Sequence, residues 1–287
     1  MRKLATAPCL RDVTAASDYP GMAERALIGA IAVALITALA RRYNVLDESG
    51  QWGAFGCGVA ASIAGWPWAL LLIAFFGAAV AVSALGETRK AERTQATNPQ
   101  VKARTATQVL ANGALFSLLA IKAGPNGASV WGLAACGAIA AASADTWATE
   151  IGSLWGGQPR SIVSFRSVLV GMSGGVTATG MLAAIAGAAF VAFAAAWLLN
   201  VEHPWVFVAA VASGGFLGAF ADSVLGATVQ ARRWCDHCKQ WTERRVHPCS
   251  YRTVYAHGIR WVSNDVVNLG ATVAGAAGAV GAGFLLR

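Results

Sequence analysis

Charged side chains are scarce in this sequence, since Asp, Glu, Lys and Arg make up only 13% of its 287 residues. A soluble domain carries about twice that share, roughly 25%, because charged groups must coat its surface. Hydrophobic residues make up 56% of the chain. This balance excludes a soluble globular protein, a coiled coil and a disordered tail, and it is typical of an integral membrane protein.

Several sequence signals are also absent. The chain has no G-x-x-x-x-G-K-[ST] sequence, which excludes a P-loop kinase. The first twenty residues lack an uninterrupted apolar core and a small-residue cleavage site, so we do not expect a cleaved signal peptide. Cys9, Cys57 and Cys136 lie alone and the other three cysteines share one polar loop, so no disulfide framework is expected.

Long apolar segments recur along the whole chain. A helix needs about 20 mostly apolar residues to cross a bilayer, and the segments that approach this length are residues 23–40, 66–85, 108–122, 129–146, 178–199, 205–225 and 265–286. Residues 53–65 are apolar but short and Gly-rich, so they form either a tight span or a re-entrant segment. We therefore predict an all-α, polytopic membrane helix bundle of seven or eight transmembrane helices, which forms a single domain over residues 1–287.

The basic residues predict the orientation of this bundle. Lys and Arg concentrate at residues 89–104 and 232–260, and the net charge is +8. Basic loops between apolar spans mark the cytoplasmic side, so nucleic acid is not expected as a partner. We predict a multi-pass protein of the cell membrane with a tail at residues 1–22 and cytoplasmic loops at 87–107, 147–177 and 226–263. With eight spans Arg41 and Arg42 fall on the same face, where the chemistry should lie.

Acidic residues at the edges of apolar segments are the main candidates for function. A charge within a span costs about 2.5–3.5 kcal/mol on insertion scales, so such residues are usually functional. Asp145, Glu150, Asp222 and Asp265 have this context. Asp145 and Glu150 are five residues apart and would share one helix face only if the helix broke near Thr146. Carboxylates beside basic loops suit Mg²⁺ held between protein and phosphate oxygens, although they also suit helix caps and partners of loop arginines.

Polar residues recur at intervals of one helical turn in two segments: Arg104, Gln108 and Asn112 in one, Asn264 and Asn268 in the other. Each set forms a polar stripe on an otherwise apolar helix, and in lipid such a stripe must face the interior of the bundle. Two such stripes that end at a basic loop are suited to line a phosphate or nucleotide site. They can also serve only to hold helices together.

A glycine-rich turn, Gly171–Thr177, precedes the helix predicted to begin near Ala178. Small residues such as Gly174 and Gly175 let backbone N–H groups approach an anion, and the start of a helix favours negative charge. A plain tight turn explains the same residues equally well.

Cysteine and histidine cluster in the last polar loop. Cys235 and Cys238 have a zinc-knuckle spacing, and His247 and Cys249 follow. These ligand types suit a tetrahedral Zn²⁺, which with four protein ligands would be structural rather than catalytic. A reduced thiol cluster without metal is the alternative.

Short motifs run through the chain in a fixed order: Glu48-Ser49-Gly50, Phe75-Phe76, Lys90, Arg104 with Gln108 to Gly113, Asp145-Thr146 with Glu150 to Gly152, Gly174-Gly175-Val176, Asp222 with Gly226, the Cys/His residues, and Asn264-Asp265 with Asn268. In this order, from about Leu46 to the C-terminus, they resemble the integral membrane family of domain of unknown function 92. Characterised plant and cyanobacterial members of that family are phytyl-phosphate kinases, and its animal members are called transmembrane protein 19.

The resemblance implies transfer of phosphate from a nucleoside triphosphate, with CTP preferred, to a phytyl or other isoprenoid monophosphate, which gives an isoprenoid diphosphate. Asp145 and Asp222 would hold Mg²⁺, and Glu150 would be a further ligand or would orient the acceptor. The phosphates would be bound and positioned by Lys90, Arg104, Gln108, Asn112, Gly174, Gly175, Asn264, Asp265 and Asn268. The prenyl tail would lie in the membrane lipid between Gly/Ala-rich helices.

Other functions use the same residues. A lipid-phosphate transporter or flippase would bind ions or headgroups with these acids, but it should carry polar residues through to the far side. A nucleotidyltransferase acting on a lipid phosphate would release pyrophosphate instead of a nucleoside diphosphate. A non-catalytic scaffold would have no use for the acids and amides. The sequence does not predict the oligomeric state.

Overall fold

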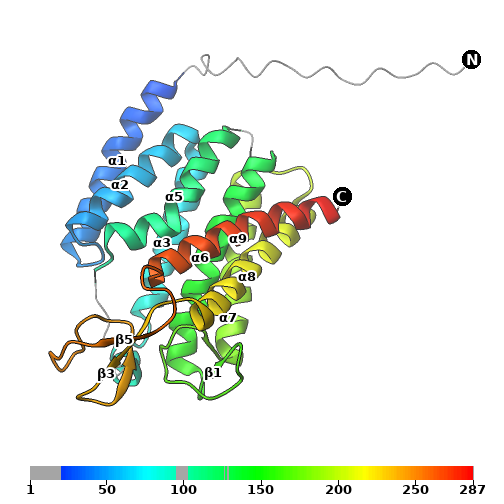
Figure 1. Cartoon of the computed structure of the whole chain (residues 1–287). Coiled ribbons are helices and arrows are strands. Elements are labelled where there is room, and N and C mark those ends of the chain that lie inside the picture. The colour runs from blue at the N-terminus through cyan, green and yellow to red at the C-terminus, as the bar shows by residue number, and fades with distance from the viewer. Residues whose placement is uncertain (1–20, 95–102, 126, 128, 287) are drawn as a thin grey trace, which may run out of the picture.

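The computed structural model of the chain describes residues 21–94, 103–125, 127 and 129–286. Over these residues the helices are α1 (Met22–Arg42), α2 (Glu48–Ala64), α3 (Trp66–Ala84), α4 (Glu87–Thr94), α5 (Ala106–Ala123), α6 (Val130–Trp155), α7 (Ala178–Leu198), α8 (Pro204–Thr228) and α9 (Asn264–Leu285). The strands are β1 (Arg160–Ser161), β2 (Gly175–Val176), β3 (Arg232–Cys235), β4 (Gln240–Thr242) and β5 (Val254–His257). Figure 1 shows that the long helices form one bundle.

The predicted all-α polytopic membrane bundle is confirmed. In the described part of the chain, 6 helices are long and apolar enough to cross a membrane, namely α1, α3, α5, α7, α8 and α9. Two further long helices lie among them, α2 with 17 residues and α6 with 26. Together they agree with the expected seven or eight spans. The segment at 53–65 is part of α2, and Gly65 joins α2 to α3 at φ 144°, a conformation that favours glycine.

Small residues allow α6, α8 and α9 to pack with their backbones close together. A Cβ atom on Gly137 of α6 would lie 2.5 Å from the carbonyl oxygen of Gly275 on α9. A Cβ on Gly214 of α8 would lie 2.4 Å from the backbone nitrogen of Ala279 on α9. Larger side chains at these glycines would force the helices apart, which explains the abundance of Gly and Ala in the sequence.

One half of the bundle is filled with large apolar side chains. Trp68, Phe116, Ile139, Val191 and Val211 are buried there in a single hydrophobic cluster. The side chain of Trp68 donates to the carbonyl oxygen of Gly124 at 2.8 Å, which ties the start of α3 to the end of α5. This half of the bundle is therefore closed by apolar packing.

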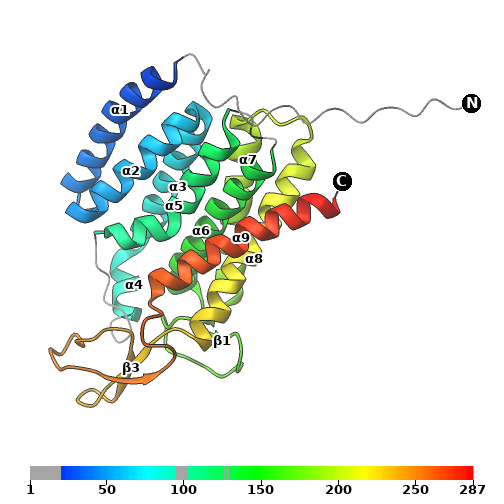
Figure 2. The same ribbon diagram turned by 45° about the horizontal axis from the view of Figure 1, so that its top comes forward.

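The polar segments gather at the other end, as Figures 1 and 2 show for α4, the β1–β2 segment and the three strands β3–β5. β1 pairs with β2, and β3 lies between β4 and β5 in an antiparallel sheet. The α1–α2 connection reaches the same region, because Arg104 donates its backbone N–H to Val45 at 2.9 Å. We call this region the polar end. Residues 1–20 of the predicted tail and 95–102 of the predicted loop lie outside the described residues.

Several helices continue further into the polar end than the boundaries predicted from the sequence. α6 continues to Trp155, so the break considered near Thr146 does not occur. No Gly or Pro interrupts the helix at this point, and the Thr146 hydroxyl donates to Ala142 O at 2.8 Å within it. α8 likewise continues to Thr228, and the predicted loop at 87–107 contains α4. The loops predicted to begin at residues 147 and 226 are therefore shorter than expected.

Candidate functional site

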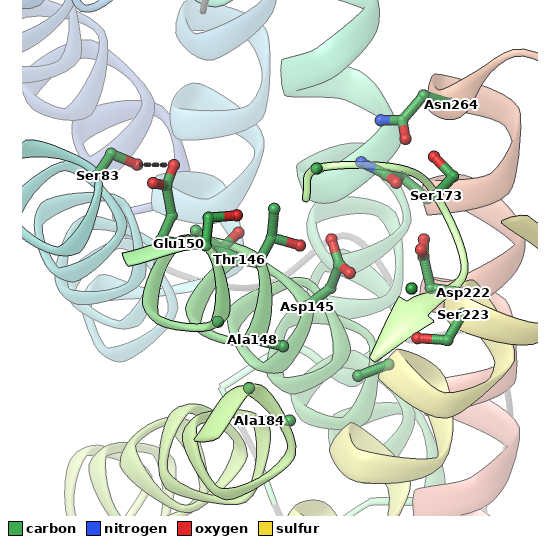
Figure 3. Close-up of a pocket in the computed structure, with 18 of the residues that line it drawn as sticks. Ser83, Asp145, Thr146, Ala148, Glu150, Ser173, Ala184, Asp222, Ser223 and Asn264 are labelled. Carbon is green, nitrogen blue, oxygen red and sulfur yellow. Dashed lines mark hydrogen bonds between the residues drawn. The ribbon is translucent and has the colours of Figure 1, made fainter. Parts of the chain in front are cut away.

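A cavity of about 590 Å³ lies at the polar end, between α3, α5, α6, α7, α8 and α9 and against the glycine-rich turn. Asp145, Glu150 and Asp222, the three acids predicted to be catalytic, all line it. Figure 3 shows that Asp145 from α6 and Asp222 from α8 project into the same space. The two carboxylates are close enough to repel each other electrostatically. Two helices distant in sequence therefore bring two acids into one cavity near the ends of apolar spans.

The partners of these two acids differ. With its amide nitrogen facing the carboxylate, Asn268 on α9 donates to Asp222 Oδ2 at 3.0 Å and to Asn264 O at 3.1 Å. The Asp145 carboxylate forms no hydrogen bond within the part of the chain that the structure describes. Its oxygens are therefore available to a ligand in the cavity.

Glu150 faces a different part of the cavity. Five residues along a helix correspond to a rotation of about 140°, so Glu150 projects toward α3 while Asp145 projects toward α8. Ser83 on α3 donates its hydroxyl to Glu150 Oε1 at 2.9 Å, and the Lys90 ammonium group lies 2.5 Å from Glu150 Oε2. Glu150 is thus held by protein partners, in contrast to Asp145.

Lys90, predicted to bind phosphate, does not line the cavity. Its side chain is completely buried, and its ammonium group donates to the carbonyl oxygens of Val82 and Ser83 as well as to Glu150. These three acceptors use all three of its hydrogens. Lys90 therefore ties α4 to α3 and α6, and the predicted phosphate contact would require breaking these bonds. A basic residue beside a span can be predicted from the sequence, whereas the direction in which its side chain points depends on how α4 packs.

Arg104, Gln108 and Asn112 all line the cavity, but only Gln108 and Asn112 lie on α5, because the helix begins at Ala106 and Arg104 pairs with Leu46 before it. Arg104 Nη2 lies 3.4 Å from the Ser83 hydroxyl, and its guanidinium group stands 5.8 Å from the centre of the Phe76 ring. Burial lowers the pKa of Arg104, and the nearby Glu150 carboxylate opposes that shift. Gln108 is partly used in the structure, because its Oε1 accepts from the backbone N–H of Thr105 in a capping box.

Of the three predicted site residues at the start of α9, two face the cavity and one does not. Asn264 and Asn268 line the cavity, whereas Asp265 does not. One residue along a helix is a rotation of about 100°, so Asp265 cannot share the face of Asn264 and Asn268. The structure therefore does not bring Asp265 together with the other predicted phosphate-binding residues, and its position in the first turn of α9 suits the positive end of the helix dipole.

Gly174 and Gly175 line the cavity, and packing alone accounts for both glycines. Gly174 has φ 77°, and a Cβ there would lie 2.5 Å from Ala227 on α8. Gly175 donates its backbone N–H to Met172 O at 3.0 Å and pairs with Ser161 between β1 and β2. Of the two explanations that the sequence allowed, these contacts favour the tight turn.

Glu243 also lines the cavity, although it was not predicted from the sequence to be a site residue. It lies just after β4, and the hydroxyl of Ser173 in the glycine-rich turn donates to its carboxylate. Burial raises the pKa of Glu243, and the bond from Ser173 and the positive charge of Arg232 act in the opposite direction. Arg232 in turn donates to the carbonyl oxygens of Ser173 and Gly226, at 2.9 and 3.0 Å. The hairpin of β3 and β4 thus adds a further acid to the cavity.

Cys235, Cys238, His247 and Cys249 form a compact cluster in that same hairpin and the loop after it. One ligand atom from each residue lies within 4.8 Å of all the others. Cys235 Sγ is 3.6 Å from Cys249 Sγ, which in turn is 3.1 Å from His247 Nδ1. The pKa of the Cys249 thiol is lowered to about 6; burial acts to raise it, but the backbone N–H of Tyr251 and the His247 side chain favour the thiolate. The predicted convergence of these four residues is confirmed, and the cluster is compatible with a metal ion.

The fold and the cavity define a polytopic membrane protein with an acid-lined cavity at one end of its helix bundle. The chain belongs to the family described as integral membrane protein DUF92, whose model matches residues 31–276. This confirms the family resemblance drawn from the motifs.

Proteins similar in sequence occur in distant organisms. The chain is 32% identical over 213 residues to an uncharacterized membrane protein of Methanocaldococcus jannaschii, across 72% of this chain and 84% of that protein. It is 30% identical over 234 residues to Protein PGR of Arabidopsis thaliana, across 74% of this chain and 81% of that protein. No solved structure matches the chain.

Proposed function

We propose that the protein is an isoprenoid-phosphate kinase, which transfers the terminal phosphate of a nucleoside triphosphate, CTP in the first instance, to a phytyl or other prenyl monophosphate. The observation that carries this proposal is the cavity itself. It combines acids on α6 and α8, amides on α5 and α9, Arg104 just before α5, and an apolar wall from α7 and α8 at the end of membrane-crossing helices. Charged phosphates and an apolar tail can be accommodated together in such a site.

The acids fit Mg²⁺ as a partner. Asp145 and Asp222 offer hard oxygen ligands from different helices, and Asp145 has no competing hydrogen bond among the described residues. Two neighbouring carboxylates repel each other, and a bound cation removes that cost. When bound, Mg²⁺ would link these acids to phosphate oxygens and offset the charge that develops on them.

The remaining cavity residues would bind and orient the two substrates. Arg104 provides a positive charge for the phosphates, and Asn112 and Asn264 provide amide donors. Asn268 fixes the orientation of the Asp222 carboxylate through its hydrogen bond. Glu150, held by Lys90 and Ser83, limits how far the phosphates can extend toward α3. These roles require positioning rather than covalent chemistry, which is the usual demand of phosphoryl transfer.

The reaction needs no strong base. An oxygen of the prenyl monophosphate, already ionised at neutral pH, attacks the terminal phosphorus of the nucleotide. The bond between that phosphorus and the bridging oxygen breaks, and the nucleoside diphosphate leaves with the electron pair. The products are a prenyl diphosphate and a nucleoside diphosphate.

The Cys/His cluster would hold a structural Zn²⁺. Bonds of about 2.3 Å in a tetrahedral site place two thiolate sulfurs roughly 3.8 Å apart, close to the 3.6 Å between Cys235 and Cys249. Three cysteines and one histidine complete the coordination, so no position is left for a substrate. The ion would stabilise the small β-sheet and, through it, the position of Glu243.

The protein would act at the cell membrane, with its polar end in the cytoplasm. The basic residues of α4 and of the β3–β5 sheet support this orientation, since they lie together at that end. The apolar cluster around Trp68 and Phe116 fills the opposite half of the bundle, which argues against a transporter.

The experiment that tests the function uses purified full-length protein in nanodiscs with Mg²⁺, CTP labelled at the terminal phosphate, and a panel of prenyl monophosphates. A kinase gives labelled prenyl diphosphate and unlabelled CDP. A nucleotidyltransferase releases labelled pyrophosphate instead, and the proposal is overturned by that result or by the absence of transfer from every nucleotide tried.

A further inference from the structure

Two apolar stripes face each other where α7 and α8 border the cavity. The apolar side chains of these helices in the lining are Met181, Ala184, Phe216, Ala219 and Phe220, and Gly180, Asp222 and Ser223 also belong to it. Met181 and Ala184 are three residues apart, and Phe216 is three and four residues from Ala219 and Phe220, so each apolar set lies on one face of its helix. We call this part of the cavity wall the side window.

Helix contacts close the side window at both of its ends. On the side of the apolar half, a Cβ on Gly215 of α8 would lie 2.9 Å from the Cβ of Ala188 on α7, so the two helices touch there. Toward the polar end, Gly174 in the turn before α7 packs against Ala227 of α8. Between these contacts Ala184 and Ala219 are buried in one cluster with Ala144 and Ala188, and they form the inner part of this wall.

Met181 and Phe220 belong to the cavity wall and to the outer surface at once. Both line the cavity, yet 41% of Met181 and 45% of Phe220 is exposed. Their exposed neighbours Leu182, Ile185 and Leu217 are all apolar, and all five residues lie in candidate membrane spans. The surface around the window therefore faces lipid, and Met181 and Phe220 border both that surface and the cavity.

We propose that a phosphate-bearing lipid enters through the side window, with its phosphate in the cavity and its apolar tail between α7 and α8. This inference rests on the proposed function. The polar interior of the cavity, with Arg104 and the acids that would bind Mg²⁺, matches the headgroup, while the window matches the tail. Met181 and Phe220 then determine which tails fit.

The part of the cavity wall formed by the α1–α2 connection and α4 differs in character. Tyr43, Asn44 and Glu87 lie there, at the polar end, beside the α1–α2 connection. These polar residues suit the water-soluble nucleotide. The two substrates thus approach from different sides, which lets the lipid remain in the bilayer throughout the reaction.

The first test locates the tail without requiring turnover. Full-length protein in nanodiscs is irradiated with a long-chain alkyl phosphate that carries a diazirine in its tail, and labelled peptides are identified by mass spectrometry. Labelling of α7 and α8 around Met181 and Phe220, abolished by excess unlabelled prenyl phosphate, is expected. Competable labelling confined to α3, around Val80 and Ala84, overturns the proposal, as does labelling that unlabelled prenyl phosphate does not reduce.

The second test uses substitutions that place larger side chains in the side window. Met181→Trp and Phe220→Trp should reduce kcat/KM for a long-chain prenyl phosphate by roughly tenfold, the scale of a lost apolar subsite, and leave a five-carbon prenyl phosphate within about twofold. Leu182→Trp and Leu217→Trp are matched controls, since both residues are exposed on the same helices and neither lines the cavity. The proposal is contradicted if kcat/KM falls equally for the long and the short substrate. It is also contradicted if the control variants lose as much activity as Met181→Trp and Phe220→Trp. If no phosphate is transferred at all, the kinase proposal fails, and the labelling pattern still decides whether a lipid phosphate uses the window.

Discussion

The Lys90 ammonium group lies 2.5 Å from Glu150 Oε2, and the lysine side chain has no exposed surface. This pair joins α4, which lies outside the bundle, to the acid-bearing end of α6. Arg93 strengthens the same junction by donating to Leu154 O at 2.9 Å and to Gly156 O at 2.5 Å, where α6 ends. Asp145 and Glu150 thus lie on a helix whose end is held by contacts from α4, as a site that depends on positioning requires.

We expect Asp145→Asn and Asp222→Asn to abolish most activity without unfolding the protein. Each substitution removes a charge that would bind Mg²⁺ and almost preserves side-chain shape. Loss of this contact should lower kcat by roughly a thousandfold, at about 1.36 kcal/mol per tenfold. Kinetics in nanodiscs, with thermal unfolding as a check on folding, provide the measurement. Asp265→Asn, an acid outside the cavity wall, is the matched control, and near wild-type turnover by either Asp145→Asn or Asp222→Asn would show that the metal site is wrong.

Lys90→Met should affect stability rather than phosphate binding. Removing one partner of a buried ion pair leaves the other charge without compensation, at a cost of about 3–5 kcal/mol. The double variant Lys90→Met/Glu150→Gln leaves no unpaired charge and should recover much of the lost stability. Thermal unfolding of the two variants is the measurement. A normal unfolding temperature in Lys90→Met together with a raised KM for the nucleotide would instead support the phosphate contact expected from the sequence.

The sequence predicts those parts of the site that follow from local patterns. A charge at the end of an apolar helix is costly, and this singled out Asp145 and Asp222. Helical spacing placed Asn264 and Asn268 on one face, and the same geometry could have excluded Asp265. The position of each of these residues follows from the few helical turns around it.

Glu243 could not be predicted in the same way. Its entry into the cavity depends on the pairing of β3 with β4 and on the docking of that hairpin against Ser173, 70 residues earlier. No local pattern encodes such a contact. Lys90 could not be placed from the sequence for a similar reason. The direction of its side chain depends on how the short polar helix α4 packs against α3 and α6.

The orientation of the bundle can be tested by cysteine accessibility. Ser164 and Lys239 are exposed and lie in separate segments of the polar end. If this end faces the cytoplasm, cysteines at both positions should react with a membrane-impermeant maleimide only after the cells are opened. Reaction of either cysteine in intact cells would reverse the predicted topology.

Metal analysis should find about one zinc per chain in protein purified without chelator. Cys238→Ser removes one of the four ligands and should lower the zinc content sharply. It should also lower activity, because the hairpin would no longer hold Glu243 against the cavity. Cys57→Ser is the control, since Cys57 is a free cysteine buried in α2 and outside the cluster. Metal-free protein with full activity would reduce the cluster to a packing element.

Glu243 should link the stability of the polar end to pH. Because burial raises its pKa in the folded protein, its contribution to stability is fully present below the unfolded pKa and is lost as the pH rises through the folded pKa. At neutral pH the charged carboxylate also repels Asp222. In the absence of divalent cations, Glu243→Gln should therefore unfold at a higher temperature than wild type at neutral pH, and the difference should shrink on acidification.

Thermal unfolding of wild type and Glu243→Gln between about pH 4 and pH 8 measures this effect. Glu202→Gln, a change at an exposed acid between α7 and α8, should show no such trend. Added Mg²⁺ should reverse the order at neutral pH, because a cation bound at Asp145 and Asp222 turns the charge of Glu243 from a source of repulsion into a favourable partner. A stability difference that is the same at every pH, with or without Mg²⁺, would mean that Glu243 only packs against Ser173 and takes no part in the electrostatics of the cavity.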